Sequence, residues 1–419
     1  MTHQELRRKL MGIEEDRIED YWRDRAECPL GSKQLFDKYD NGIVPEGQVV
    51  TLKIDRRSAQ QRNPFNCLVC AATGVGKDRL IKNIIKAYHK AGFKILHFEP
   101  KGIEMFNARK MGSGSKLHHK DKNDSLPVVG YCPNYIRAYL KKYYPELIRK
   151  IKFYSHDMEK LNYLEIWQSF GVPVKISSMV VKLIEQGITD YKLILQKLKG
   201  AGLHRMTEQA VVTAFDSLEA TNFFGARNSL QLKESWDRGE VVNIMYLSRG
   251  GAMMNTDIGL ILDLVKDVSM EENRQGMKNV SKKLIIFNDA FYYAGMKATM
   301  STKYTGGTNL AILNIQNCQN NFRSWGVDTM FVVQSPDSNA VYPALIDGCT
   351  TKLVSYVENP TALQNKLPFH AYRLLMGGGR PGEESLFVNE EKYEYEWIKV
   401  LGKTRCERFF KFDCSLGHI

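Results

Sequence analysis

The chain has 419 residues, of which 43% are hydrophobic and 25% charged, and its formal net charge is +12. This length and composition allow one large core or two modest ones, and they exclude a disordered tail or a repeat array. No run of about 18 apolar residues occurs, and the amino-terminal MTHQELRRKL is charged where a signal peptide needs apolar residues. We therefore expect a cytoplasmic protein without a membrane span. The basic charge suits a polyanionic partner.

The first predicted element is an amphipathic helix over residues 4 to 26, in which Leu6, Leu10, Ile13 and Trp22 recur near helical spacing. A stretch punctuated by Gly and Pro separates this helix from the following segments. The helix can pack on its own domain, or it can dock onto a neighbouring subunit or a recruiting protein. We treat residues 1–40 as an N-terminal helical arm and residues 41–419 as one domain.

From about residue 49 onward, strand-like and helix-like segments alternate, which is typical of an α/β fold with a mostly parallel sheet and crossover helices. One such helix is expected over residues 77–91, and a mostly helical insertion or lid at about residues 177–235. Residues 109–127 lack a periodic apolar face, so we expect a mobile basic loop there. The predicted strands cover residues 49–54, 65–70, 93–98, 128–131, 150–154, 241–247, 283–287, 329–333 and 352–357.

Eight cysteines are scattered along the chain without the paired spacing of a zinc module, so we expect reduced thiols. Cys67 and Cys70 form a C-x-x-C, but they lie in the apolar run FNCLVC. A buried strand explains this pair better than a metal or redox site does.

The sharpest motif is AATGVGKD at residues 71–78, directly after a predicted strand and before a predicted helix. Gly74 and Gly76 allow successive N–H groups to face one centre, and Lys77 can reach the terminal phosphates of a nucleotide. The pattern predicts a phosphate-binding loop for ATP. Its nucleotide-binding residues are expected to be Thr73, Gly74, Val75, Gly76, Lys77, Asp78 and Arg79.

The loop departs twice from the pattern G-x-x-x-x-G-K-[ST]. Ala71 replaces the first Gly, and Asp78 replaces the Ser or Thr that normally holds Mg²⁺. A Gly-rich turn that binds no ligand is the alternative interpretation.

LIIFNDA at residues 284–290 is the best candidate for the carboxylate that holds the metal or polarises water. An Asp followed by a second acid would be usual, but here Asn288 precedes Asp289. Asp289 is either the general base, with Asn288 on the metal side, or itself the metal-side residue. Since Asp78 adds an acid where Asn288 lacks one, the two departures could exchange a carboxylate around Mg²⁺, although coincidence or lost hydrolysis would leave the same sequence.

Gln334 follows the predicted strand TMFVV and begins Q-S-P, so it should lie at the same edge of the sheet as the other motifs. An amide at this position can sense the γ-phosphate or position water.

The order of these motifs resembles the FtsK/HerA superfamily of ring-forming, DNA-pumping ATPases, which have a RecA-like fold. The resemblance covers about residues 49–390. It rests on AATGVGKD, FEPKGIE (98–104), SWDRGEVVNIMYLS (235–248), LIIFNDA, FRSWGVDTMFVVQSPDS (322–338), CTTKLVSYVENP (349–360) and GGGRPGE (377–383).

The resemblance implies phosphate binding by Gly74, Gly76 and Lys77, metal or water handling by Asn288 and Asp289, and γ-phosphate sensing by Gln334. Arg323 stands where the family often has an arginine that reaches a neighbour's nucleotide, with Arg249 and Arg380 as rivals. An ordinary surface arginine is the alternative.

The family's translocation loops contact the DNA backbone, which requires basic, flexible segments. Residues 295–309 offer Lys297 and Lys303, and the loop at 109–122 offers Arg109 and Lys110; both could instead be solvated surface.

The stretch before the phosphate loop is too short for the β-barrel of cellular HerA proteins. A stripped-down motor of a virus or mobile element fits better, in the host cytoplasm or associated with a virion.

Two hypotheses result. The first is an ATP- and Mg²⁺-dependent double-stranded DNA translocase that works as a homo-oligomer, expected by analogy to be a hexamer, in genome packaging or mobile-element transfer. The second is a nucleotide-binding structural or regulatory subunit with little hydrolysis. A small-molecule kinase is disfavoured, because the sequence has no acceptor-site motif.

Overall fold

The computed structural model describes most of the chain between residues 25 and 411. The described residues are 25–33, 36–37, 42–43, 49–59, 61–63, 65–101, 126–199, 204–220, 222–225, 229–247, 251–294, 310–335, 341–376, 386, 388–389, 394–401 and 405–411.

One large sheet organises the molecule, with 13 strands among the described residues. Its eight-strand centre, from β14 to β8, is parallel throughout, whereas the strands beyond β14 pair antiparallel. In sheet order the strands are β4 (Val49–Asp55), β1 (Arg25–Lys33), β17 (Arg405–Lys411), β16 (Glu394–Leu401), β14 (Thr351–Val354), β5 (Asn66–Cys70), β13 (Val327–Val333), β12 (Lys283–Phe287), β6 (Lys94–Glu99), β11 (Val241–Met245), β7 (Val128–Pro133) and β8 (Lys152–Tyr154), and β15 (Val388–Asn389) pairs with β16.

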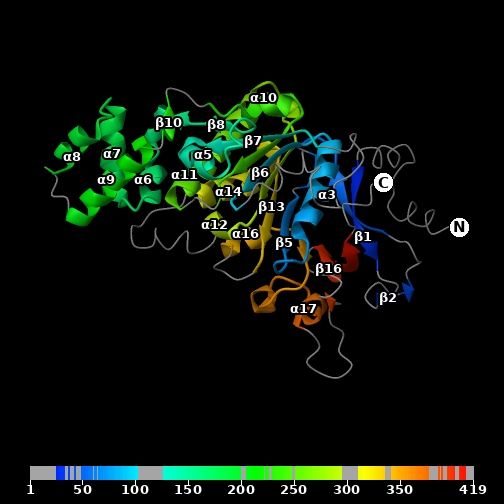
Figure 1. Ribbon diagram of the computed structural model, residues 1–419. Coiled ribbons are helices and arrows are strands. Elements are labelled where there is room, and N and C mark those ends of the chain that lie inside the picture. The colour runs from blue at the N-terminus through cyan, green and yellow to red at the C-terminus, as the bar shows by residue number, and fades with distance from the viewer. Residues whose placement is uncertain are drawn as a thin grey trace.

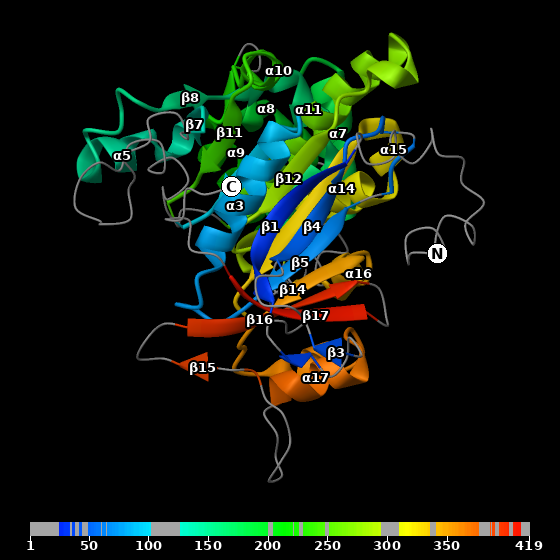
Figure 2. The ribbon, with the colours of Figure 1, turned by 90° about the vertical axis from the view of Figure 1, so that its right-hand side faces the viewer.

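The central strands are buried along their whole length, as their continuous apolar sequences require when helices cover both faces of a parallel sheet. Helices α3 (Lys77–Lys90) and α14 (Leu310–Asn320) lie on either side of these strands (Figure 2). The other helices of the body are α5 (Arg137–Tyr143), α10 (Leu232–Asp237), α11 (Ala252–Arg274), α12 (Phe291–Ala294), α15 (Phe322–Trp325), α16 (Pro343–Asp347) and α17 (Phe369–Met376), with 3-10 turns η3 (Asn134–Ile136), η5 (Met277–Asn279) and η6 (Pro360–Leu363).

The predicted α/β fold with a mostly parallel sheet is confirmed, and each of the nine predicted strands overlaps an observed one. The largest difference is at β14, which ends at Val354 and not at residue 357. The strand predicted over residues 283–287 is β12 without any shift. Cys67 and Cys70 are buried in β5, and no disulfide links the described cysteines.

The N-terminal boundary differs from the prediction. Residues Arg25–Lys33, which the sequence analysis placed in the helix and arm, form strand β1 between β4 and β17. Pairing on both edges overrides the helical periodicity of this short stretch. The rest of the predicted helix, residues 4–24, lies outside the described residues.

A helical unit forms at one end of the sheet, far from β1 (Figure 1). Its apolar core includes Trp167, Val180, Ile194 and Val211 and is distinct from the main core around the sheet, with Leu260 of α11 and Leu310 of α14 also contributing to it. The observed helical unit begins earlier than residue 177, where the sequence predicted its start. Its elements are η4 (Met158–Asn162), α6 (Leu164–Ser169), α7 (Val174–Glu185), α8 (Tyr191–Lys199) and α9 (Arg205–Ala220), next to the short strands β9 (His156–Asp157) and β10 (Phe224–Gly225).

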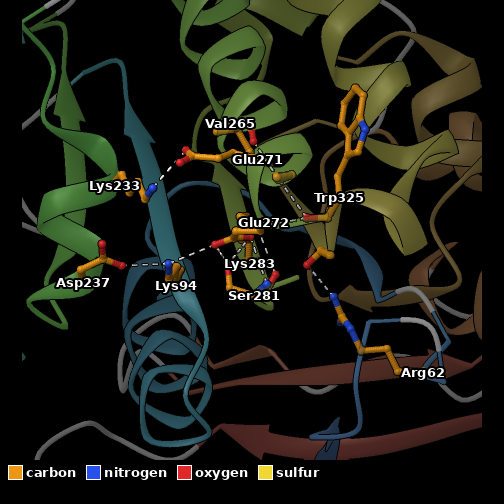
Figure 3. A network of polar contacts seen from close by, with 12 residues as sticks. Arg62, Lys94, Lys233, Asp237, Val265, Glu271, Glu272, Ser281, Lys283 and Trp325 are labelled. Carbon is orange, nitrogen blue, oxygen red and sulfur yellow. Dashed lines mark hydrogen bonds and ion pairs between the residues drawn. The ribbon is translucent and has the colours of Figure 1, made fainter. Parts of the chain in front are cut away.

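Buried charges are paired at the amino ends of the central strands (Figure 3). Lys283 Nζ donates to Glu272 Oε2 at 2.7 Å and to the Trp325 carbonyl at 3.2 Å. Arg62 forms an ion pair with Asp328 and donates to the Gly326 carbonyl at 2.7 Å. Gly326 has a φ of 67°, and a Cβ there would lie 2.3 Å from the Ser281 carbonyl oxygen, so this turn requires glycine.

Burial lowers the pKa of Lys283 to about 8, against the opposing effect of Glu272. Burial would raise the pKa of Glu272, but the charge of Lys283 and the hydrogen bonds from Lys283 and Ser281 outweigh it and lower the value to about 2. The pair is therefore ionised at neutral pH.

No helix among the described residues is long and apolar enough to cross a membrane. Two short strands, β2 (Phe36–Asp37) and β3 (Gly42–Ile43), form a separate hairpin.

Candidate nucleotide-binding site

The glycine-rich loop connects β5 to α3, as the sequence predicted. Gly74 and Gly76 have φ values of 87° and 86°, a left-handed conformation that is costly for residues with a Cβ. Two backbone bonds anchor the start of the loop, from Ala71 N to the Val333 carbonyl at 3.2 Å and from Ala72 N to the Tyr356 carbonyl at 2.7 Å. The loop is thus fixed to the strands on both sides of β5.

Lys77 begins α3 and is held against this loop. Its Nζ donates to the carbonyls of Ala71 at 2.6 Å and Ala72 at 2.8 Å, and the residue is 8% exposed. Burial lowers the pKa of Lys77, while the carboxylates of Asp78 and Asp289 act in the opposite direction. The amine therefore lies within electrostatic reach of both acids that the sequence singled out.

Asp289 lies just beyond the end of β12. The backbone here is held by bonds from Asn288 N to the Phe98 carbonyl at 3.1 Å and from Ala290 N to the Val332 carbonyl at 3.0 Å. Asp289 has a φ of 44°, which is uncommon outside glycine and is tolerated best by Asp and Asn. The neighbouring strands hold this strained residue in place, as is frequent at functional sites.

Two side chains from other strand ends meet at one oxygen of Asp289. Gln334, after β13, donates from Nε2 to Asp289 Oδ1 at 3.3 Å, and Lys101, after β6, places its Nζ 3.4 Å from the same oxygen. Lys101 also lies over the Tyr292 ring, 5.5 Å from its centroid. The structure thus brings together two predicted residues, Asp289 and Gln334, with Asn288 adjacent in the chain, and Lys77 lies within electrostatic range of Asp289.

Lys101 is a site residue that the sequence analysis missed. It lies in FEPKGIE, which supported the family resemblance but received no chemical role. The usable signal was its position three residues after the predicted strand at 93–98, because side chains that follow parallel strands meet at one edge of the sheet.

Register explains the convergence of these side chains. Phe287 of β12 is paired with Phe98 of β6 and Phe331 of β13. Their rings are stacked across the three strands, with centroids 5.5 Å and 5.2 Å apart and interplanar angles of 13° and 11°. The strand ends that carry Lys101, Asp289 and Gln334 therefore rest on one aromatic layer.

Glu99 is a second acid at this edge, but it faces the interior. It is buried and accepts a hydrogen bond from Asn243 Nδ2 at 2.9 Å, and Asn243 Oδ1 lies 2.7 Å from His97 Nδ1. This geometry suits a structural carboxylate better than a base that receives a proton from solvent.

The predicted metal ligands fit a hard cation by their chemistry. Asp78 is exposed in the first turn of α3, and Asp78, Asn288 and Asp289 offer oxygen atoms, which Mg²⁺ prefers. Within the described part of the chain, no three His, Cys, Asp or Glu residues cluster as a metal site. Mg²⁺ in nucleotide sites commonly uses only one or two carboxylates together with phosphate oxygens.

The remaining predicted site residues are described only in part. The backbone of Arg79 lies in α3 and that of Arg323 in α15, but their side chains fall outside the described residues. Arg323 precedes β13, so it lies at the opposite end of this strand from Gln334. Also outside the described residues are Arg109, Lys110, Arg249, Lys297, Lys303 and Arg380.

The parallel sheet, the glycine-rich loop after β5 and the polar residues after β12 and β13 define a RecA-like P-loop NTPase fold. No family model and no curated protein sequence matches the chain. VirB4 of Thermoanaerobacter pseudethanolicus has a similar structure, with a TM-score of 0.50 and 12% identity over 83% of this chain and 89% of that one. At this identity the similarity concerns the fold alone.

Two other solved structures are similar more loosely. The plasmid coupling protein TrwB, in complex with the ATP analogue ADPNP, has a TM-score of 0.43 and 12% identity over 84% of this chain and 78% of that one. The cytoplasmic domain of the Type VII secretion ATPase EccC of Thermomonospora curvata has a TM-score of 0.34 and 10% identity, over 95% of this chain and 29% of that one.

Proposed function

We propose that this chain is a Mg²⁺-dependent ATPase of the FtsK/HerA type that moves double-stranded DNA as a homo-oligomeric ring, with six subunits, in genome packaging or mobile-element transfer. The observation that carries the proposal is the meeting of Lys101, Gln334 and Asp289 beside the phosphate loop and Lys77.

The loop and Lys77 would bind the phosphates. Backbone N–H groups around Gly74 and Gly76 would face them, and the start of α3 adds a positive partial charge. Lys77 would exchange its two carbonyl partners for phosphate oxygens, which attract its charge more strongly.

Asp289 would orient or deprotonate the attacking water, or hold the metal, and Gln334 would report the presence of the γ-phosphate. Mg²⁺ would be held by Asp289 with Asp78 or Asn288, and would neutralise charge on the phosphates. Lys101 would exchange its contact with Asp289 for a phosphate oxygen, because the ion pair between Lys101 and Asp289 is partly exposed and long.

The net charge of the chain and the order of its motifs support the proposed ring and its DNA substrate. The net charge of +12 favours a polyanion. Arg323 would reach a neighbour's nucleotide, Lys297, Lys303, Arg109 and Lys110 would contact the DNA backbone, and the N-terminal residues would recruit a partner protein.

ATP hydrolysis with Mg²⁺, measured with and without long duplex DNA, tests the proposal. We expect DNA-stimulated turnover that Lys77→Ala removes. Lys352→Ala is the matched control, because Lys352 is also 8% exposed and also donates to a backbone carbonyl, that of Cys349 at 2.7 Å, away from the site. Nucleotide binding without turnover in the wild type would contradict the ATPase proposal.

A nucleotide-binding structural or regulatory subunit is the second candidate, and Asp78 favours it. This acid stands where the Mg²⁺-holding hydroxyl normally lies and is exposed at the start of α3. If Asp78 supplies the carboxylate that Asn288 lacks, Asp78→Ser abolishes metal-dependent turnover, because it removes a direct ligand of Mg²⁺. An increase in turnover would instead mean that Asp78 impairs hydrolysis.

A further inference from the structure

The order of the strands in the sheet indicates how a nucleotide bound at this site would be oriented. Strands β13 and β12, which carry Gln334 and Asp289, lie on one side of β5, and β14 lies on the other. Terminal phosphates that face Lys77 and Asp289 are therefore on the β13 side of the loop. A nucleoside end that extends away from Asp289 would lie toward the carboxyl end of β14.

Tyr356 lies at this end of β14. Its carbonyl accepts the 2.7 Å hydrogen bond from Ala72 N, and the preceding Ser355 N donates to the Cys70 carbonyl at 3.0 Å. These bonds tie Tyr356 to both the phosphate loop and the strand before it. Its position relative to bound phosphates is thus set by the same backbone that forms the loop.

The side chain of Tyr356 is 38% exposed, although both of its neighbours are buried. Ser355 Oγ donates to the Glu396 carbonyl at 2.5 Å, and Val357 packs into the main core. The ring is therefore exposed on a residue whose backbone is bonded to the loop and whose two neighbours are buried.

We propose that Tyr356 is the residue on which the nucleotide base stacks. This inference rests on the proposed nucleotide site. An aromatic face stacks on any base, because every base has a π-face, and it leaves base identity to other contacts. Tyr356 thus adds affinity for a nucleoside triphosphate over inorganic phosphates and accepts ATP and GTP alike.

Calorimetric titration of the full chain with ATP, GTP and inorganic tripolyphosphate tests the assignment. Tyr356→Ala should weaken ATP and GTP binding by about tenfold, the usual effect of removing one stacking partner, and leave tripolyphosphate binding unchanged. Tyr356→Phe should restore the affinity. Tyr143→Ala is the control, since Tyr143 is 53% exposed on α5 at the far end of the sheet.

Tyr356→Trp gives a second readout that does not depend on the alanine variant folding. ATP should quench its added fluorescence and tripolyphosphate should not. Unchanged ATP affinity in Tyr356→Ala, or equal weakening of ATP and tripolyphosphate, would overturn the stacking role while the nucleotide site stands. A wild type that binds neither ligand would overturn the nucleotide site together with the stacking role.

Discussion

Charged side chains have different kinds of partner at the two ends of the central strands. At the amino ends, Lys283 faces Glu272 and Arg62 faces Asp328, so each charge has an opposite partner fixed by the fold. At the carboxyl ends, Lys77 is held by backbone carbonyls, and Asp289 shares one oxygen between Gln334 and the partly exposed Lys101.

Removing a charge therefore has different consequences at the two ends. A buried pair that loses one partner leaves an uncompensated charge, which destabilises the fold. Where the charged side chains form long ion pairs or contact neutral groups, a ligand can replace these partners. Residues of such a site therefore affect function more than stability. The comparison predicts which substitutions change activity and which change folding.

The largest expected effect is on turnover, from Asp289→Asn. Asparagine tolerates the left-handed backbone at this position, so the substitution removes the charge without adding strain. We expect the ATP turnover number to fall by about 1000-fold, within the range attributed to a general base, and the melting temperature to stay near that of the wild type. Steady-state kinetics and thermal unfolding measure the two quantities.

Asp267→Asn serves as a surface control, because Asp267 is half exposed and pairs with Lys160 at 3.4 Å. Turnover of Asp289→Asn within tenfold of the wild type would show that the carboxyl ends do not carry the chemistry.

Glu272→Gln should have the next largest effect, on stability. Lys283 would remain as a fully buried cation without its carboxylate, which costs about 3 kcal/mol of unfolding free energy. Glu271→Gln is the matched control, since this neighbouring glutamate is 53% exposed and pairs with Lys233 on the surface. Urea unfolding of both variants measures the difference in stability. Equal unfolding midpoints would contradict the prediction that charges at the amino ends of the strands matter mainly for stability.

A smaller effect is expected in acid. The pKa of Glu272 is about 2 in the folded protein and near 4.5 otherwise, so its stabilising contribution is complete above pH 4.5 and declines as the pH falls toward 2. The stability difference between wild type and Glu272→Gln should therefore shrink across this interval. Thermal unfolding at a series of pH values measures it, and a constant difference would mean that Glu272 titrates normally.

Local sequence signals predicted the phosphate loop, the central strands and the helix that follows the loop. They sufficed because a run such as KLIIF or TMFVV has one favourable environment, a sheet covered on both faces. Asp289 and Gln334 could be placed for the same reason, since each directly follows such a run. Strand β1 was missed because its sequence is not continuously apolar and one of its two partners, β17, is distant in the chain.

Pairs far apart in the sequence could not be predicted from it. Lys101 and Asp289 are 188 residues apart, and Arg62 and Asp328 are 266 apart. Neither pair has a local pattern, because only the strand order brings its members together. The same holds for Tyr356, whose nearness to the loop follows from β14 lying beside β5.

The separate core of the helical unit has an evolutionary consequence. Because Trp167, Val180 and Ile194 pack within this unit, and the body adds only Leu260 and Leu310 to its buried core, its helices can gain, lose or exchange residues away from those two contacts while the register under the phosphate loop is preserved. Lineages descended from a common ancestor should therefore diverge fastest here, and transplanting the unit between them should leave nucleotide turnover intact.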